Sequence, residues 1–349
     1  MTSSLRIPRW LLFFTCTTFV FLLYRWWFFP LIRLTFGLAA LPVRWKDSSS
    51  PALITRDRDQ FDVTFASYAV NQTSAAPEYD DLVPSILHHI NLGSRPPRDE
   101  WVAARSQCLR YHEGWDFHLW DDASANAFVQ DHFPHLKNMW DSYPYPVQRV
   151  DALRYMVLYK YGGVVLDFDL ACKRSLGPLR RFDFVAPAAH PTGFSIGMLL
   201  ASPNNTFVDE LVHNLPIYNR YWFFLPYVTV MFSTGCHYAS TLYTLQPHRA
   251  ALRILAGTNA HPRLHMLNGF VETPLFRHLG TSSWHSFDAI FINMIGNSKR
   301  LPLLIFLVVA SFVAGSLAAV YATMRIRARC STPKTCGTSP DLKGAYKNV

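Results

Sequence analysis

The segment Arg149–Leu170, RVDALRYMVLYKYGGVVLDFDL, constrains the fold of this chain more than any other stretch. Its first part places apolar residues at helical spacing, which predicts a helix with a buried face. The Gly162-Gly163 pair ends that helix, because glycine readily takes the left-handed conformation found at helix C-termini. Val164–Leu166 then predicts a short buried strand. This order of helix, glycine turn and strand indicates an α/β domain with an open sheet.

Two carboxylates, Asp167 and Asp169, stand at the end of the predicted strand. Side chains alternate along a strand, so both acids project to one side while Phe168 turns the other way. Such oxygen ligands suit a divalent cation that keeps positions open for phosphate oxygens. Upstream, Asp151 and Arg154 share one face of the helix. The alternative is an exposed pair of acids and a surface ion pair, because a bare D-x-D is common.

The complete string is more specific than its parts. It resembles the signature D-x-x-R-Y…L-Y-x-Y-G-G-x-Y-x-D-x-D of glycosyltransferase family 32, with Val165 in place of the usual aromatic residue. The resemblance extends over residues 83–286. It implies a GT-A-type nucleotide-diphosphosugar transferase domain, a divalent cation with Mn²⁺ as the first choice, and retention of the anomeric configuration.

The resemblance also implies a role for each matching residue. Asp167, Asp169 and His285 form the implied catalytic and metal-binding group, in which the metal bridges the donor diphosphate. Arg154 is expected to contact a phosphate or the donor sugar, and Asp151 a sugar hydroxyl. Asp167 also belongs to the expected donor site.

The segment Gly280–His285 resembles the closing G-S-S-W-H motif of the same family. That resemblance places Trp284 at the donor sugar nucleotide and His285 at the metal. A neutral imidazole beside Asp169 can bind the metal or donate to the leaving phosphate. The alternative is that Trp284 and His285 form a packing pair.

Two strand-like stretches precede the central motif. Val83–Ile90 resembles the opening strand of the family, where His88 either approaches the nucleotide or finishes a buried strand with its ring hydrogen-bonded. Trp115–Trp120 alternates as a strand and leads into Asp121 and Asp122. Either acid can cap the following helix, and this role is favoured over a nucleotide contact.

Two further stretches are distinctive in composition. Tyr218–Phe232 is dense in aromatic residues and predicts a buried, strand-rich segment, with a loop at a bilayer interface as the alternative. Ser233–Cys236 resembles the S-T-G-P turn of the ceramide-directed members of the family, with Cys236 in place of proline. Cys108, Cys172 and Cys236 lie in the main domain, so at most one disulfide is expected there, and buried free thiols are the default.

The chain has 349 residues, of which 50% are hydrophobic and only 16% charged. Trp10–Phe29 and Leu301–Met324 account for much of this apolarity and predict transmembrane helices. A cleaved signal peptide is the alternative for the first segment. Two spans would leave the main domain in the lumen of the Golgi or the endoplasmic reticulum, with both tails cytoplasmic. Glycosylation sequons at Asn71 and Asn204 fall in this luminal part.

The expected domain order follows from these features. It is a cytoplasmic tail and signal-anchor helix over 1–29, a luminal stem over 30–82, the transferase domain over 83–286, a juxtamembrane amphipathic helix over 287–300, a transmembrane helix over 301–324 and a basic cytoplasmic tail over 325–349.

The formal net charge of +9 suits an anionic partner. Basic runs with interleaved aromatics are missing, so a membrane surface or a phosphorylated substrate is favoured over nucleic acid. The resemblance implies a membrane-bound retaining mannosyltransferase that moves mannose from GDP-mannose to the lipid inositol-phosphoceramide. The alternatives are a related transferase acting on protein-linked glycans and a non-catalytic membrane subunit of a glycosyltransferase complex. A regulatory membrane subunit is a further expected partner.

Overall fold

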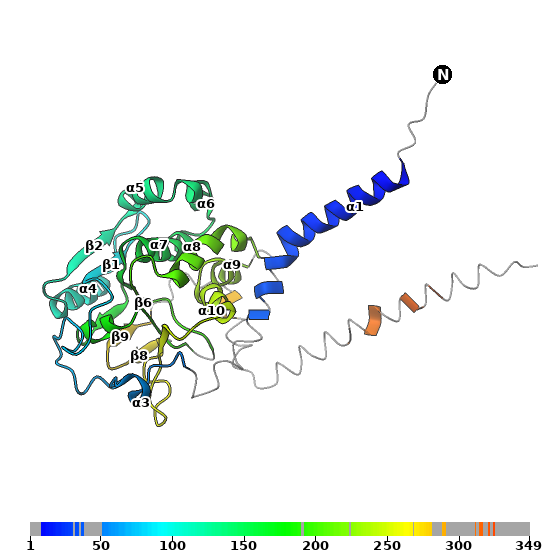
Figure 1. The fold of residues 1–349 in the computed structure, drawn as a ribbon. Helices are drawn as coiled ribbons and strands as arrows, with labels where there is room; N and C mark the ends of the chain where they lie inside the picture. Colours follow the sequence, from blue (N-terminus) through cyan, green and yellow to red (C-terminus); the bar gives the residue numbers. More distant parts are fainter. Residues whose placement is uncertain are drawn as a thin grey trace, which may run out of the picture. The chain divides into compact units, whose positions relative to one another are not determined.

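A computed structural model describes residues 8–30, 32–34, 36–37, 51–189, 192–222, 225–267, 269–280 and 288–290, and then 311, 314–316, 320–321 and 324 (Figure 1). The chain divides into one unit over Met1–Ala289 and a second over Ile290–Val349. All the strands, and the helices described below, belong to the first unit.

A central sheet of six strands organises the first unit, in the order β2-β1-β3-β6-β5-β7. Its strands are β1 (Ile86–Ile90), β2 (Asp116–Trp120), β3 (Gly163–Leu166), β5 (Phe184–Pro187), β6 (Met198–Ala201) and β7 (Leu252–Leu255). β1 runs parallel to both β2 and β3, whereas β6 is antiparallel to β3 and β5. The predicted α/β class is confirmed, with a mixed sheet. The carboxyl ends of β1, β2 and β3 meet at one edge, where α/β proteins bind ligands.

A smaller antiparallel sheet takes over the chain directly after the D-x-D motif. It consists of β4 (Leu170–Cys172), β9 (Phe276–Leu279) and β8 (Phe270–Glu272), in that spatial order. Leu170 lies opposite His278 in the β4–β9 pair, and Cys172 lies opposite Phe276. The β8–β9 hairpin is therefore attached to the strand that begins one residue after Asp169.

Helices make up the other regular elements of the first unit. They are α1 (Arg9–Leu23), α3 (Arg56–Asp59), α4 (Asp99–Tyr111), α5 (Asp122–His132), α6 (Lys137–Ser142), α7 (Pro146–Tyr161), α8 (Thr206–Tyr218), α9 (Pro226–Ser233) and α10 (Cys236–Leu245). α7 packs against β3, β6, α8 and α9, while α4 packs against β4. Figure 1 shows α7 to α10 grouped together.

The helix, turn and strand predicted for the central motif are confirmed. α7 begins at Pro146, where a fixed backbone angle suits the first helical position. Gly162 and Gly163 have φ angles of 67° and 93°, which other residues adopt at a cost. A Cβ on Gly163 would lie 2.6 Å from the backbone oxygen of Ile86. The turn thus needs glycine both for its backbone angles and for its close approach to β1.

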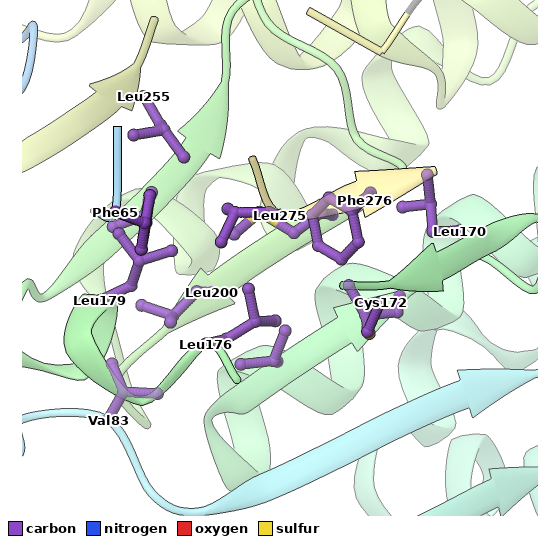
Figure 2. Packing of buried hydrophobic residues seen from close by; sticks show 14 of the residues in the cluster. Phe65, Val83, Leu170, Cys172, Leu176, Leu179, Leu200, Leu255, Leu275 and Phe276 are labelled. Carbon is purple, nitrogen blue, oxygen red and sulfur yellow. The ribbon is translucent and has the colours of Figure 1, made fainter. Parts of the chain in front are cut away.

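The main hydrophobic cluster joins the two sheets. Figure 2 shows Phe276 of β9 beside Leu170 and Cys172 of β4, in the same cluster as Leu200 of β6. Ile54, Phe61 and Phe65 are also fully buried members of this cluster. Part of the predicted stem therefore packs within the core of the domain.

A disulfide joins Cys108 of α4 to Cys172 of β4. The limit of one disulfide in the main domain is confirmed, whereas the default expectation of free thiols was wrong for these two residues. Cys236 is a free cysteine. Which two of the three would pair was decided by the packing of α4 on β4, because a disulfide requires the two Cα atoms to lie within about 7 Å.

The prediction of strands over Tyr218–Phe232 was wrong, because part of this segment is helix α9. Pro226 starts the helix, and the carboxylate of Asp288 accepts hydrogen bonds from the N–H groups of Tyr227 (2.8 Å) and Val228 (3.3 Å). A carboxylate at a helix N-terminus is stabilising. This cap comes from 60 residues downstream, so the tertiary structure overrode a composition that is typical of strands.

Within the described ranges, none of the helices has both the length and the apolarity needed to cross a bilayer. In the predicted first anchor, α1 has 15 residues and is followed by a π-helical turn over Tyr24–Phe28. The predicted second span, 301–324, is described only at 311, 314–316, 320–321 and 324. Both anchors, and the amphipathic helix expected over 287–300, stay predictions.

Candidate active site

The first acid of the motif, Asp167, continues the pairing of β3 with β6. Its backbone N–H donates to the carbonyl oxygen of Gly197 at 2.8 Å. Gly197 leaves room for the carboxylate, because a Cβ there would lie 3.0 Å from Asp167 Oδ2. The Asp167 side chain is 39% exposed. It is therefore held at the sheet edge by the backbone and still reachable from solvent.

Arg154 of α7 supplies the positively charged side chain of the site. Its Nη2 lies 2.7 Å from Asp167 Oδ1 and 3.8 Å from Asp151 Oδ1, and its side chain is only 3% exposed. Burial by itself lowers the pKa of Arg154, but Asp167 and Asp151 outweigh this effect and raise the pKa. Its Nε and Nη1 atoms are buried without a hydrogen-bond partner among the described residues. The guanidinium thus keeps donors available for a ligand oxygen.

Asp151 is buried behind this arginine. Its Oδ2 accepts a hydrogen bond of 3.1 Å from the hydroxyl of Thr234. Burial raises the pKa of Asp151 to about 7, with a smaller contribution from Asp167, while Arg154 and Thr234 act in the opposite direction. A carboxyl group with such a pKa can accept or donate a hydrogen bond near neutral pH.

Thr234 links the central motif to the Ser233–Cys236 turn. Besides bonding Asp151, it accepts a hydrogen bond of 2.6 Å on its backbone oxygen from the hydroxyl of Tyr155. Sequence analysis gave Thr234 no role, although the S-T-G turn was a signal that pointed to this stretch. Two motifs about 80 residues apart thus hold one acid in place.

The second acid, Asp169, has a different partner. Its Oδ2 lies 3.3 Å from Nε2 of His278, and the two side chains are 13% and 16% exposed. The backbone oxygen of Asp169 accepts a hydrogen bond of 2.9 Å from Leu279. His278 was missed by sequence analysis, because a single histidine in a short strand carries no signal by itself. Its only sequence clue is its place just before the Gly280–His285 motif.

The structure brings four of the predicted site residues to one place, since Asp151, Arg154 and Asp167 are joined by ion pairs and Asp169 follows Asp167 on the same chain. Trp284 and His285 lie outside the described residues, and their roles in donor and metal binding stay predictions.

The structure decides between the alternatives for His88 and identifies the acid that caps α5. His88 is fully buried, bonds to the backbone oxygen of Gly162 at 3.0 Å and accepts a hydrogen bond of 3.2 Å from Trp120. Its structural role is confirmed. Asp121 caps α5 through the N–H of Ser124, as favoured, and the carboxylate of Asp122 accepts a bond of 2.6 Å from Gly93.

The two acids of the motif suit a divalent cation. Burial and the neighbouring Asp169 raise the pKa of Asp167, whereas Arg154 lowers it. Two nearby carboxylates repel each other, and a cation between them relieves that repulsion. In the part of the chain that the structure describes, no three His, Cys, Asp or Glu side chains are grouped to hold a metal. Asp167 and Asp169 by themselves fit a cation that completes its coordination with diphosphate oxygens and water.

A groove with a volume of ≈ 570 Å³ lies between α4 and the β8–β9 hairpin. His278 lines it together with Gln107 of α4 and Arg277 of β9. Phe270, which also lines the groove, is 82% exposed. The groove therefore borders the histidine that contacts Asp169.

Comparison with known proteins places these residues in a family. The family described as glycosyltransferase sugar-binding region containing DXD motif matches residues 98–185. Inositol phosphoceramide mannosyltransferase 1 of Schizosaccharomyces pombe is 32% identical over 266 residues, which cover 74% of this chain and 80% of that protein.

Two other similarities cover less of the chain, and one of them is to a solved structure. Mannosyl phosphorylinositol ceramide synthase SUR1 of Saccharomyces cerevisiae is 32% identical over 64% of this chain, but only 57% of its own length is spanned. A solved structure, PaToxG Glycosyltransferase, aligns with a TM-score of 0.33 and 15% identity over 47% of this chain and 70% of that chain.

Proposed function

We propose a specific reaction for this chain, which belongs to the DXD-containing glycosyltransferases of family 32, the family of the inositol phosphoceramide mannosyltransferases. The proposed reaction is the transfer of mannose from GDP-mannose to inositol-phosphoceramide with retention of the anomeric configuration. The observation that carries the proposal is the joining of Asp151, Arg154 and Asp167 into one ion-pair network next to Asp169. This network combines the buried guanidinium of Arg154 with carboxylates at the ligand-binding edge of the sheet. It suits a nucleotide diphosphate and its sugar.

Asp167 and Asp169 would hold a divalent cation, with Mn²⁺ as the first choice and His285 as a further proposed ligand. When bound, such an ion acts as a Lewis acid and offsets the charge that develops on the diphosphate leaving group. Trp284 is proposed to contact the donor sugar nucleotide.

The protein residues perform the remaining tasks. Arg154 is fixed by two carboxylates in a nearly dry environment, where its charge acts more strongly on a phosphate or donor sugar than it would in water. Asp151, held by Thr234, would bond a sugar hydroxyl and orient the ring. Because both side chains are anchored before the donor arrives, little ordering is required on binding.

A lipid acceptor at a luminal membrane face is the second part of the proposal. The names of the relatives and the net charge of +9 support an anionic phosphoinositol lipid. The disulfide Cys108–Cys172 supports a compartment that is oxidising, such as the secretory pathway. We therefore propose that the domain lies in the Golgi lumen, between the two predicted membrane anchors.

The proposal is tested by measuring transfer in membranes that contain the full chain. Inositol-phosphoceramide would be the acceptor, with labelled GDP-mannose, UDP-glucose and UDP-galactose as donors, each with Mn²⁺ or with a chelator. We expect metal-dependent labelling of the lipid from GDP-mannose alone, and labelling at least about 100-fold weaker with Asp169→Asn. Labelled glycoprotein without labelled lipid would favour the glycan-directed alternative. No product from any donor, in membranes that hold folded protein, would favour the non-catalytic subunit.

A further inference from the structure

His278 stands in a position that no sequence motif predicts, opposite the D-x-D motif on the β8–β9 hairpin. It lies between two paired strands, with Leu170 of β4 on one side and Val271 of β8 on the other. A side chain on the middle strand of a sheet is held firmly in place. The pairing of its strand on both sides therefore fixes the backbone of His278 opposite Leu170, the neighbour of Asp169.

The two ring nitrogens of His278 face different groups. Nδ1 lies 2.5 Å from the backbone oxygen of Gly269, which can only accept a hydrogen bond. Nδ1 must therefore carry the proton in this contact, and in the neutral ring Nε2 then presents a lone pair. That lone pair faces Oδ2 of Asp169 at 3.3 Å. Two acceptors directed at each other in a nearly buried place are unfavourable unless a cation or a proton stands between them.

Metal sites in proteins use this same arrangement. A histidine that binds a metal usually donates its other ring N–H to a carbonyl or carboxylate, which fixes the tautomer and the orientation of the ring. Two donor atoms at about 2.1 Å from one ion lie roughly 3 Å apart, close to the distance between His278 Nε2 and Asp169 Oδ2. A metal site also needs a path of entry, and His278 itself borders a groove.

We propose that His278 is a nitrogen ligand of the divalent cation bound by Asp169. This inference rests on the proposed function, because that function supplies the cation, and it adds a ligand that the family motifs did not indicate. It also has a consequence for selectivity. Mg²⁺ and Ca²⁺ prefer oxygen ligands, whereas transition-metal ions accept an imidazole nitrogen more readily, so His278 would bias the site against Mg²⁺ and Ca²⁺.

The test is pulsed electron paramagnetic resonance of Mn²⁺ bound to the full chain in detergent, with GDP present. Imidazole coordination produces a nitrogen modulation of the Mn²⁺ signal. We expect this modulation in the wild type and its reduction in His278→Gln. The glutamine amide can still donate to Asp169, so the fold is expected to be retained, but it offers no nitrogen lone pair. Mn²⁺ affinity should fall by about 10-fold or more, and the preference for Mn²⁺ over Mg²⁺ should shrink.

His213→Gln is the matched control, because His213 makes the same kind of contact, 3.0 Å from Asp209, on the exposed side of α8. This variant should leave both the modulation and the Mn²⁺ affinity unchanged. The nitrogen modulation is also measured in His285→Gln. Modulation that persists in this variant and falls in His278→Gln would come from His278.

Each result decides the inference. An unchanged nitrogen modulation in His278→Gln, with Mn²⁺ still lost in Asp169→Asn, would overturn the ligand role of His278 and leave the proposed metal site intact. Bound Mn²⁺ without any nitrogen modulation in the wild type would reduce Asp169–His278 to a simple ion pair. Failure of the wild type to bind Mn²⁺ with GDP would overturn the metal site itself, together with this inference.

Discussion

The two acids of the D-x-D motif differ in how the chain surrounds them. Asp167 is paired with Arg154, which lies 13 residues upstream in the same helix–turn–strand unit. Asp169 is paired with His278, which comes from a hairpin at the end of the domain. The first pairing is built by local structure and carries a permanent positive charge, since arginine stays protonated. The second depends on the docking of the β8–β9 hairpin on β4.

This difference indicates a division of labour. The Asp151–Arg154–Asp167 network is almost fully buried on its helical side, and it suits a fixed grip on the donor. In the Asp169–His278 pair, His278 borders a groove. A cation bound between the two side chains would replace their direct contact of 3.3 Å. The two halves can be disturbed separately, which makes the comparison testable.

Removing the charge of the second acid should have the largest effect. Asp169→Asn keeps the shape of the side chain but lowers its affinity for a cation, so we expect mannosyl transfer to fall by at least about 100-fold. Thermal unfolding of the variant should stay close to that of the wild type. Transfer is measured with labelled donor in membranes, and full activity in the variant would remove Asp169 from the metal site.

Breaking the disulfide should destabilise the domain and disturb the surroundings of Asp169. Cys108→Ala with Cys172→Ala opens a loop with a sequence separation of 64 residues, and the expected loss in the free energy of unfolding is about 2–4 kcal/mol. Because β4 starts one residue after Asp169, Mn²⁺ affinity should fall as well. Chemical unfolding and Mn²⁺ titration measure the two effects. Cys236→Ala, which removes a free cysteine, is the control, and an equal loss in that variant would contradict the role of the disulfide.

Removing the hydroxyl of Thr234 should disturb the Asp151 half alone. Thr234→Val leaves one oxygen of a buried carboxylate without its donor, which should cost about 1–2 kcal/mol in the free energy of unfolding. Thr241→Val is the matched control, because the buried hydroxyl of Thr241 has no hydrogen-bond partner among the described residues. Thermal unfolding compares the two variants. A loss of the same size in both would show that Thr234 acts by packing and not through Asp151.

The smallest expected effect, counted per pH unit, is a dependence of the free energy of unfolding on pH. The pKa of Asp151 is raised from 3.8 to about 7, so the protonated form is favoured in the folded state. Its contribution to stability is therefore complete below pH 3.8 and is lost as the pH rises through about 7. The slope cannot exceed about 1.4 kcal/mol per pH unit for one proton.

Asp151→Asn should remove this part of the pH dependence. Unfolding of the wild type and the variant would be followed between pH 4 and 8 at constant ionic strength. Parallel curves over this range would show that Asp151 does not titrate there.

Local patterns predicted the central motif because they act over short distances. The apolar spacing of α7, the paired glycines and the apolar run of β3 are sufficient to specify a helix, a turn and a strand. The placement of Asp167 and Asp169 at the strand end follows from this order, as does their suitability for a cation. Arg154 could be assigned to the site for the same reason, since it lies on the helix that precedes the strand.

Long-range contacts were decided only by the tertiary structure. The hairpin carrying His278, the turn carrying Thr234 and the Asp288 cap of α9 each come from far along the chain. Their local sequences do not specify their partners, because a hydrogen bond between distant segments forms only once packing has brought them together. The sequence by itself therefore determined the family, the central motif and its acids. The tertiary structure decided which groups face those acids, because burial and pairing are properties of the whole fold.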